Sequence, residues 1–294
     1  MSRQIDFDLW LENRETMTTF MVPALVLGIV GAVGALLLYF VSRWFRVEED
    51  PRIAEVEALL PGANCGGCGC SGCHDFAVKC AGAETLDGLN CPGAGAEAMK
   101  KIASIVGLAS TDAEAKVAQL KCNGCREARK EVARYDGVAR CSVVNLTGSG
   151  AMSCSYGCLG CGDCVSACRF GAIYIDENSG LPVVDSDKCT GCGVCAGACP
   201  RGLIELRSKG PRGLRVWVAC SSRDKGGVAR QKCTNACIGC SKCVSVCPFG
   251  AIAVNGNVAY IDASKCKACR KCVAVCPVGA IHVTNMPRRA VSEV

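Results

Sequence analysis

Cysteine dominates the chemistry available to this chain of 294 residues: 28 residues are cysteine, whereas aromatic residues make up only 5%. Four cysteine runs share the spacing C-x2-C-x2-C-x3-C. Thiols this close in sequence are typical of metal ligands, and repeated triplets fit iron–sulfur clusters better than the two separated cysteine pairs of a zinc site. The runs are Cys158, Cys161, Cys164 and Cys168; Cys189, Cys192, Cys195 and Cys199; Cys237, Cys240, Cys243 and Cys247; and Cys266, Cys269, Cys272 and Cys276.

This spacing also predicts how the thiolates divide between clusters. Three thiolates of such a run bind one [4Fe–4S] cluster, and the fourth binds the other cluster of the domain. Exposed clusters need a reducing compartment, so we do not expect disulfide bonds. The expected ligand sets are Cys158, Cys161 and Cys164 with Cys199; Cys189, Cys192 and Cys195 with Cys168; Cys237, Cys240 and Cys243 with Cys276; and Cys266, Cys269 and Cys272 with Cys247.

A cysteine block nearer the N-terminus has a different spacing, C-x2-C-x4-C-x17-C. We expect its four thiolates to hold a fifth [4Fe–4S] cluster. Cys70 and Cys80 are then left over, and we interpret His74 as a bystander. The expected ligands are Cys65, Cys68, Cys73 and Cys91.

Four further cysteines precede the first run and could bind a sixth cluster: Cys122, Cys125, Cys141 and Cys154. Cys220 and Cys233 repeat the spacing of Cys141 and Cys154. The sequence leaves open whether this second pair is vestigial or shares a further cluster with other thiolates. The chain is therefore expected to hold at least five clusters, and six if the Cys122 set binds one.

The residues around the cysteines predict the elements that must position them. The β-branched tails IYI, IEL, IAV and IHV after the four runs predict short strands, and VSAC, AGAC, VSVC and VAVC predict short helices. Segments 52–60 and 94–106 have a helical pattern. The predicted fold class is α+β, with domains at 47–108 (four cysteines), 109–153 (linker), 154–210 (first ferredoxin-like domain) and 211–294 (second ferredoxin-like domain).

The N-terminal region, residues 1–46, contains an uncharged apolar run over residues 20–41. A helix of that length reaches about 33 Å, enough to cross a bilayer. A signal peptide is disfavoured because the run is too long and no A-x-A cleavage site follows it. We expect a single-pass protein of the cell (inner) membrane. The arginines that follow the span and the reducing environment that clusters need place the N-terminus outside and the cluster domains in the cytoplasm.

The net charge of +6 excludes little on its own. Nucleic acid is not an expected partner, because aromatic interleaving and a recognition motif are absent. The basic residues among the motifs form either a solvated face or a docking surface for an acidic protein. They are Lys188, Lys232, Lys242, Lys265, Lys267, Arg270 and Lys271. No P-loop, nucleophile–base pair or dinucleotide fingerprint is present, so we expect electron transfer without catalytic residues.

The order of these features resembles one family over essentially the whole chain. An apolar helix, then LLPGANCGGCGCSGC and CPGAGAEAMKKIA, then ferredoxin motifs are similar to the RnfB subunit of Rnf (Rsx) electron-transport complexes, in the long form with two ferredoxin-like domains. In that family the first cysteine block supplies four ligands, and Cys70 stands in place of an aromatic residue. Many relatives carry an apolar residue at the position of Cys161, which leaves open whether Cys161 or a neighbour completes its cluster.

The resemblance also implies a function and partners. RnfB-like subunits take electrons from soluble reduced ferredoxin and pass them to other subunits of a membrane complex, which hold flavins and reduce NAD while Na⁺ or H⁺ is translocated. The chain would then be an enzyme subunit, part of an ion-transporting ferredoxin:NAD⁺ oxidoreductase. Two alternatives stay open: the cluster-carrying subunit of a membrane hydrogenase or formate dehydrogenase, and an Rsx-type complex that keeps a redox sensor reduced.

Overall fold

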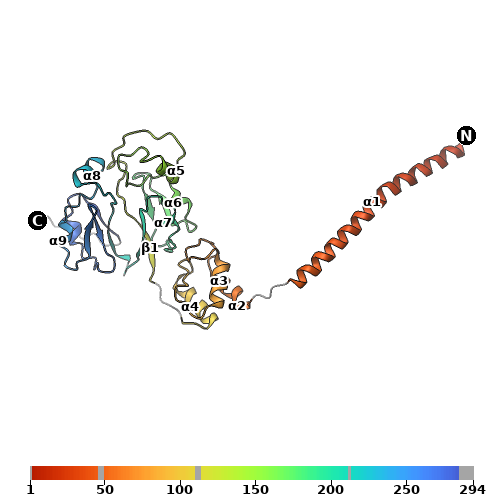
Figure 1. Cartoon of the computed structure of the whole chain (residues 1–294), viewed down its shortest axis with the longest axis horizontal. Coiled ribbons are helices and arrows are strands. Elements are labelled where there is room, and N and C mark those ends of the chain that lie inside the picture. Colours follow the sequence, from red (N-terminus) through yellow and green to blue (C-terminus); the bar gives the residue numbers. More distant parts are fainter. Residues whose placement is uncertain (1, 46–49, 110–113, 211–212, 285–294) are drawn as a thin grey trace. The chain divides into compact units, whose positions relative to one another are not determined.

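A computed structural model describes residues 2–45, 50–109, 114–210 and 213–284 of the chain (Figure 1). The chain divides into two compact units, Met1–Asp50 and Pro51–Val294. The first unit contains one long helix. The second contains the cysteines, and it is mixed α+β as the sequence predicts.

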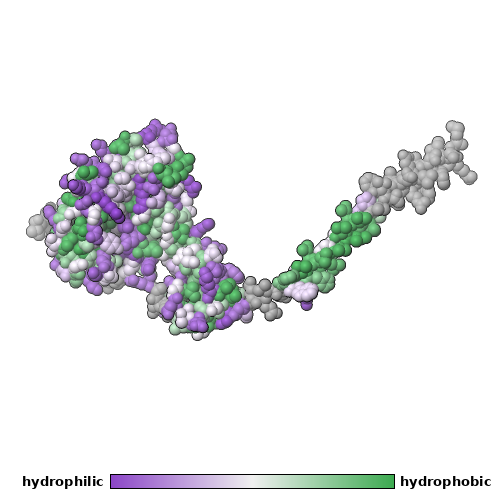
Figure 2. All heavy atoms as spheres, in the orientation of Figure 1, coloured by the Kyte–Doolittle hydropathy of each residue, from purple (hydrophilic) through white to green (hydrophobic). Residues whose placement is uncertain are grey.

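The first unit is built on α1 (Ser2–Trp44). Its segment Pro23–Trp44 has a mean hydropathy of 2.6 and is long and apolar enough to cross a membrane. Large apolar side chains such as Leu27 and Leu38, each 72% exposed, lie along it, and Figure 2 shows this stretch as hydrophobic surface. A helix that is apolar on all sides needs an apolar environment, so α1 is consistent with a membrane anchor over the expected span.

Three helices form the four-cysteine domain: α2 (Pro51–Leu59), α3 (Cys73–Gly82) and α4 (Gly95–Val106). They pack around a core that includes Val56, Phe76 and Ile102, all at most 1% exposed. The helical patterns over 52–60 and 94–106 correspond to α2 and α4 within one residue at each end. The loops between the helices carry Cys65, Cys68 and Cys91, so this small core positions the first cysteine block.

The first ferredoxin-like half consists of two strand pairs and short helices. Strand β1 (Lys116–Leu120) pairs antiparallel with β4 (Ile204–Ser208), and β2 (Ile173–Ile175) pairs antiparallel with β3 (Pro182–Val184). The helices are α5 (Cys141–Leu146), α6 (Asp163–Ser166) and α7 (Val194–Gly197).

The second ferredoxin-like half repeats this topology. Strand β5 (Arg215–Val218) pairs antiparallel with β8 (Ile281–Thr284), and β6 (Ile252–Asn255) pairs with β7 (Val258–Ile261). Its helices are α8 (Gly226–Lys232), α9 (Lys242–Ser245) and α10 (Lys271–Ala274). The strands predicted after the cysteine runs correspond to β2, β4, β6 and β8, and the predicted short helices to α6, α7, α9 and α10.

The segment expected as a linker, 109–153, differs from that expectation. It contributes β1 and α5 to the first half. Strand β1 has only five residues, and its partner β4 begins 84 residues after β1 ends (Leu120 to Ile204). A local sequence pattern cannot reveal a pairing over that separation, since β propensity depends on the neighbouring strand.

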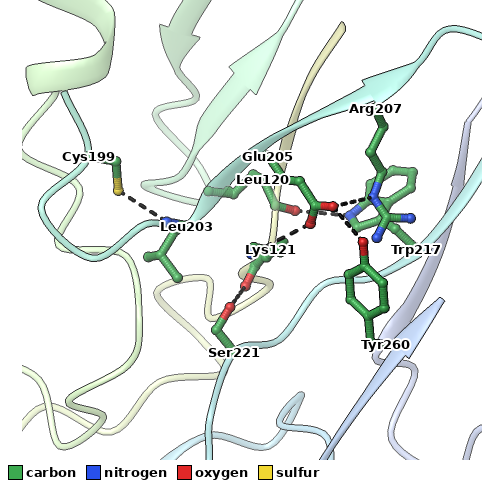
Figure 3. Close-up of polar contacts among 9 residues, drawn as sticks. All are labelled: Leu120, Lys121, Cys199, Leu203, Glu205, Arg207, Trp217, Ser221 and Tyr260. Atoms are coloured by element: carbon green, nitrogen blue, oxygen red, sulfur yellow. Dashed lines mark hydrogen bonds and ion pairs between the residues drawn. The ribbon is translucent and has the colours of Figure 1, made fainter. Parts of the chain in front are cut away.

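Hydrogen bonds join the two ferredoxin-like halves along a seam (Figure 3). The indole N–H of Trp217 donates to the carbonyl oxygen of Leu120 at 2.9 Å, and the Ser221 hydroxyl donates to the carbonyl oxygen of Lys121 at 3.0 Å. The Tyr260 hydroxyl donates to Glu205 Oε1 at 2.7 Å. The loops that follow β1 and β5 are therefore held side by side.

Candidate metal centres

The loops of the four cysteine runs share one backbone shape. In each run, two residues between the first three cysteines have a positive φ, for example Gly191 (+73°) and Gly193 (+82°). Three of the equivalent positions in the second half are not glycine: Ser241 (+59°), Ala268 (+52°) and Arg270 (+65°). This conformation costs an L-residue about 1–2 kcal/mol, and such strain persists where the surroundings fix the loop. The common shape fits loops that wrap around one kind of group.

In the second half, two cavities are each lined by four cysteines. One cavity has a volume of about 370 Å³ and the other about 310 Å³. The first brings together Cys237, Cys240, Cys243 and Cys276; the second brings together Cys247, Cys266, Cys269 and Cys272. Both groups coincide with ligand sets that the spacing predicts, including the exchange of the fourth cysteine between runs.

The corresponding cavity of the first half, about 400 Å³, contains a different combination of cysteines. Its lining includes Cys141 and does not include Cys161. The carboxylate of Asp163 accepts hydrogen bonds from the amides of Cys141 and Ser142 at 2.9 and 3.0 Å, and so holds the start of α5 against the run. The cysteines that line the cavity are Cys141, Cys158, Cys164 and Cys199.

The second ligand set of this half also gathers in space. Burial, followed by the charges of neighbouring thiolates, raises the pKa of the Cys195 thiol to about 12. Burial is the larger cause; the further rise in pKa from like charges, which disfavour thiolates in the absence of a metal, shows that other thiols lie near Cys195. The neighbours include Cys189, Cys192 and Cys168, the expected partners of Cys195.

Main-chain amides point at several of these thiols. Ala172 N–H donates to Cys168 Sγ at 3.4 Å, Leu203 N–H donates to Cys199 Sγ at 3.4 Å, and Ala118 N–H donates to Cys189 Sγ at 3.5 Å. Figure 3 includes the Leu203 contact. Hydrogen bonds to the sulfur ligands stabilise negative charge and tune the potential of an iron–sulfur cluster. The donor set fits the group that the spacing predicts.

In the four-cysteine domain, three of the expected ligands come together. Burial raises the pKa of the Cys91 thiol, and the nearby charges of Cys68 and Cys65 add to the rise. Cys73 begins α3, where its amide donates to Asn64 Oδ1 at 2.7 Å.

The remaining polar and sulfur side chains discussed for this domain contact residues of the same domain. His74 Nδ1 lies 3.0 Å from Glu57 Oε2. Cys70 and Cys80 are buried in the helical core, 6% and 0% exposed. Lys79 Nζ donates to Cys70 Sγ at 3.6 Å.

The first cysteine block lies directly against the first ferredoxin-like half. A Cβ on Gly67 would stand 2.6 Å from the carbonyl oxygen of Cys192 and 2.7 Å from its Cβ, so only glycine fits without a shift. After burial, the charge of Cys65 contributes to the raised pKa of Cys192. The two ligand groups therefore meet without an intervening side chain at this contact.

Within the described part of the chain, no group of three or more His, Cys, Asp or Glu residues is placed to hold a single metal ion. Each thiolate of a [4Fe–4S] cluster binds a different iron atom, so its ligands lie further apart than those of one zinc ion.

The cysteines that the sequence left unassigned also have defined places. Cys122, Cys154, Cys220 and Cys233 line one further cavity, of about 420 Å³. Cys125 packs against Cys233 but does not line that cavity. The sequence suggests one set of Cys122, Cys125, Cys141 and Cys154, whereas Cys141 lines the first-half cavity and Cys125 lines neither cavity.

Sequence comparison agrees with this geometry. A profile of the 4Fe-4S dicluster domain matches residues 157–203 and 236–280, and a second 4Fe-4S dicluster profile matches residues 185–251. These ranges contain the four cysteine runs. They identify the two halves as ferredoxin-type dicluster domains.

Curated relatives extend the similarity over most of the chain. The B subunit of a Na⁺-translocating ferredoxin:NAD⁺ oxidoreductase complex from Acetobacterium woodii is 42% identical over 85% of this chain and 73% of the relative. The B subunit of a proton-translocating ferredoxin:NAD⁺ oxidoreductase complex from Clostridium ljungdahlii is 41% identical over 84% and 86%. The B subunit of an ion-translocating oxidoreductase complex from Methanosarcina acetivorans is 40% identical over 82% and 89%. The chain belongs to the RnfB family, the iron–sulfur B subunits of ion-translocating oxidoreductase complexes.

Proposed function

We propose that this chain takes electrons from reduced ferredoxin and delivers them to partner subunits that reduce NAD⁺, in a membrane complex that translocates Na⁺ or H⁺. Two of the relatives are, by name, parts of ferredoxin:NAD⁺ oxidoreductase complexes, one Na⁺-translocating and one proton-translocating. When bound, [4Fe–4S] clusters supply reversible electron carriers over a wide range of potential. The residues of this chain would bind these clusters, shield them from solvent and hold them in sequence along the protein.

The observation that carries the proposal is the uneven exposure of the thiols. Of the 28 cysteines, all of which the structure describes, only Cys240 and Cys269 are exposed. Both belong to the second ferredoxin-like half. An electron donor that docks there reaches the metal ligands without crossing protein, so this half is the entry end.

Charge at the entry end favours an acidic donor. Lys242, Lys267 and Lys271 are exposed, lie two residues from Cys240 or Cys269, and form no ion pair within the described ranges. By contrast, Lys232 is paired with Asp224 at 2.9 Å. Unpaired positive charge on a surface steers and orients a negatively charged partner. This supports a docking surface rather than a merely solvated face.

The ligand sets form a row that leads away from this surface. Thiols of neighbouring sets lie close enough for each to feel the other's charge: Cys243 with Cys272 in the second half, and Cys164 with Cys195 in the first. The contact of Cys192 with Cys65 continues the row into the four-cysteine domain. We assign a fifth cluster to Cys65, Cys68, Cys73 and Cys91, and place this domain at the end of the row nearest the anchor in the sequence.

The first-half cavity leads to one revision of the ligand sets. We assign Cys141, Cys158, Cys164 and Cys199 to that cluster, with Cys141 in the place that Cys240 has in the second half. This assignment accounts for the apolar residue that many relatives carry at the position of Cys161.

The anchor orientation follows from charge and from the clusters. Arginines follow the apolar segment, and iron–sulfur clusters are assembled in the reducing cytoplasm. We assign an outside N-terminus and cytoplasmic cluster domains in the inner membrane. A small epitope tag at the N-terminus of intact spheroplasts should be accessible to antibody from outside, and protection of that tag would reverse the assignment.

The experiment that tests the function is rapid mixing of the purified full chain with reduced ferredoxin. We expect bleaching of the iron–sulfur absorbance, and a rate that falls as salt is added. Replacing Lys242, Lys267 and Lys271 together by Glu should slow this reaction about ten-fold at low salt. Reduction by the small anion dithionite should still reach the same end point.

The matched control replaces Lys100 and Lys101 by Glu, since both are exposed on α4 in the four-cysteine domain. That variant should react with ferredoxin at the unchanged rate. If ferredoxin fails to bleach clusters that dithionite reduces, or if both lysine variants behave alike, ferredoxin does not donate at this surface.

A further inference from the structure

The two ferredoxin-like halves present equivalent pairs of cysteines outside the four runs. Cys122 lies two residues after the end of β1, and Cys220 lies two residues after the end of β5. Cys154 and Cys233 each precede the first cysteine of a run by four residues. The equal sequence spacing suggests Cys141 as the counterpart of Cys220, whereas the fold pairs Cys220 with Cys122.

The hydrogen bonds of these thiols repeat as well. Cys122 Sγ accepts from the amide of Cys158 at 3.3 Å and from the amide of Gly124 at 3.4 Å. Cys220 accepts from the amide of Cys237 and from that of Ser222. Cys158 and Cys237 are the first cysteines of equivalent runs, so the amide donors match in both halves.

All four thiols meet at the seam between the halves. They line one cavity together. A Cβ on Gly124 would stand 3.5 Å from Cys122 Sγ and 3.7 Å from Cys233 Sγ. The hydrogen bond from Ser221 to the Lys121 carbonyl fixes Cys122 and Cys220, one residue away on each side, next to each other.

A largely buried cation in the same cavity has two nitrogens without a hydrogen-bond partner among the described residues. Arg129 lines the cavity, and its Nε and Nη1 atoms are buried with no hydrogen-bond partner among the described residues. Its Nη2 atom lies 3.7 Å from Glu131, whose side chain is 60% exposed. A largely buried charge whose one ion pair is long and solvent-exposed is costly. A [4Fe–4S] cluster with four thiolates is an anion in both of its usual oxidation states, and would supply a second, closer counter-charge.

We propose that Cys122, Cys154, Cys220 and Cys233 hold an additional [4Fe–4S] cluster on the boundary between the two halves, with two thiolates from each half. This inference rests on the proposed electron-transfer function and extends it. The site lies between the Cys158 set and the Cys237 set. Cys158 lines both the first-half cavity and the seam cavity, and the main-chain amide of Cys237 donates a hydrogen bond to Cys220. In each transfer the seam cluster would accept one electron from one neighbouring cluster and give one electron to the other, with no net chemical change.

This site differs from the sixth set that the sequence suggests. Cys141 belongs to the first-half cavity, and Cys125 lies outside the seam cavity. A zinc ion is the competing occupant for four thiolates, and acid-labile sulfide, which only a cluster contains, separates the two. Loading a cluster deprotonates each thiol that binds it.

The test counts clusters in the full-length chain, purified without oxygen in detergent, by native mass spectrometry and by iron and acid-labile sulfide. Single variants Cys122→Ala, Cys154→Ala, Cys220→Ala and Cys233→Ala should each lose one cluster, about four iron and four sulfide. The control Cys125→Ala removes a thiol three residues from Cys122 and should keep every cluster. Arg129→Met should keep every cluster and make one centre harder to reduce in a potentiometric titration.

The inference is overturned if the four variants keep the wild-type number of clusters, or if each loses more than one cluster. It is also overturned if Cys125→Ala loses a cluster as well, or if the site holds zinc without sulfide. The count does not involve ferredoxin. A wild-type chain that ferredoxin cannot reduce, but whose seam cluster is counted, would therefore contradict the proposed function and leave this site standing.

Discussion

The carboxylate of Asp163 accepts a hydrogen bond from the main-chain amide of Cys141, 22 residues away, with 2.9 Å between oxygen and nitrogen. Asp163 stands between Cys161 and Cys164, so the run itself holds in place a thiol from outside the run. The same carboxylate caps the start of α5 through the amide of Ser142. One side chain thus holds both the start of α5 and the thiol that we propose as a metal ligand.

Replacing Asp163 by Ala should loosen Cys141 and destabilise the first half by about 1 kcal/mol, the usual effect of losing an N-terminal cap. We expect faster iron release from one cluster, measured with a chelator, and a lower thermal midpoint. Asp187→Ala is the control because the Asp187 side chain is 96% exposed. Equal release rates in the two variants would show that the cap does not hold Cys141.

Cys141→Ala should remove one cluster, whereas Cys161→Ala should leave all clusters in place. The reason is that Cys141 lines the first-half cavity and Cys161 does not. Electron paramagnetic resonance of the dithionite-reduced chain, together with iron content, separates the two variants. The opposite pattern would restore the ligand set that the spacing predicts.

Gly191→Ala should destabilise the chain strongly, because the new Cβ would overlap the carbonyl group of Lys116, 2.8 Å from its carbon, at a φ of +73°. Gly202→Ala is matched for conformation, with φ +58° and no atom within 4 Å of the new Cβ. That control should cost only about 1–2 kcal/mol. Thermal unfolding should therefore show the larger loss of stability for Gly191→Ala. Equal losses of stability would mean that β1 shifts at little cost to make room for the new Cβ.

Tyr260→Phe should weaken the seam by about 1 kcal/mol, since a hydrogen bond to a carboxylate is lost at a partly exposed site. The bond to Glu205, followed by burial, raises the pKa of Tyr260 above its ordinary value of 10.0. The stabilisation is complete below pH 10 and is lost as the pH rises through the raised pKa. The control is Tyr174→Phe, because the Tyr174 side chain is 53% exposed. Denaturant unfolding at neutral pH compares the stabilities of the two variants.

How far the sequence predicts this structure depends on the distance over which each feature is encoded. The strands and short helices beside the cysteine runs are local: β2 follows Cys168 and α6 contains Cys164, so their positions could be read directly. Strand β1 could not be found, because its only support is a partner far along the chain.

The candidate sites divide in the same way. The sets that include Cys237 and Cys266 follow from the spacing of two runs, and the cavities contain those cysteines. Cys141 enters its cavity through a side-chain cap, and Cys122 reaches Cys220 through the seam, neither of which leaves a mark in sequence spacing. The equal intervals Cys141–Cys154 and Cys220–Cys233 even point to the wrong structural counterparts.

The seam between the halves also has a consequence for biosynthesis. Cys122 leaves the ribosome well before Cys220, and domains of a growing chain generally fold in that order. The first half can acquire its own clusters early, but the seam site is complete only after Ser221 has bonded to Lys121. The proposed seam cluster can therefore be inserted only after the second half has folded, and a chain cut short after the first half would carry only two of the four proposed ligands, Cys122 and Cys154.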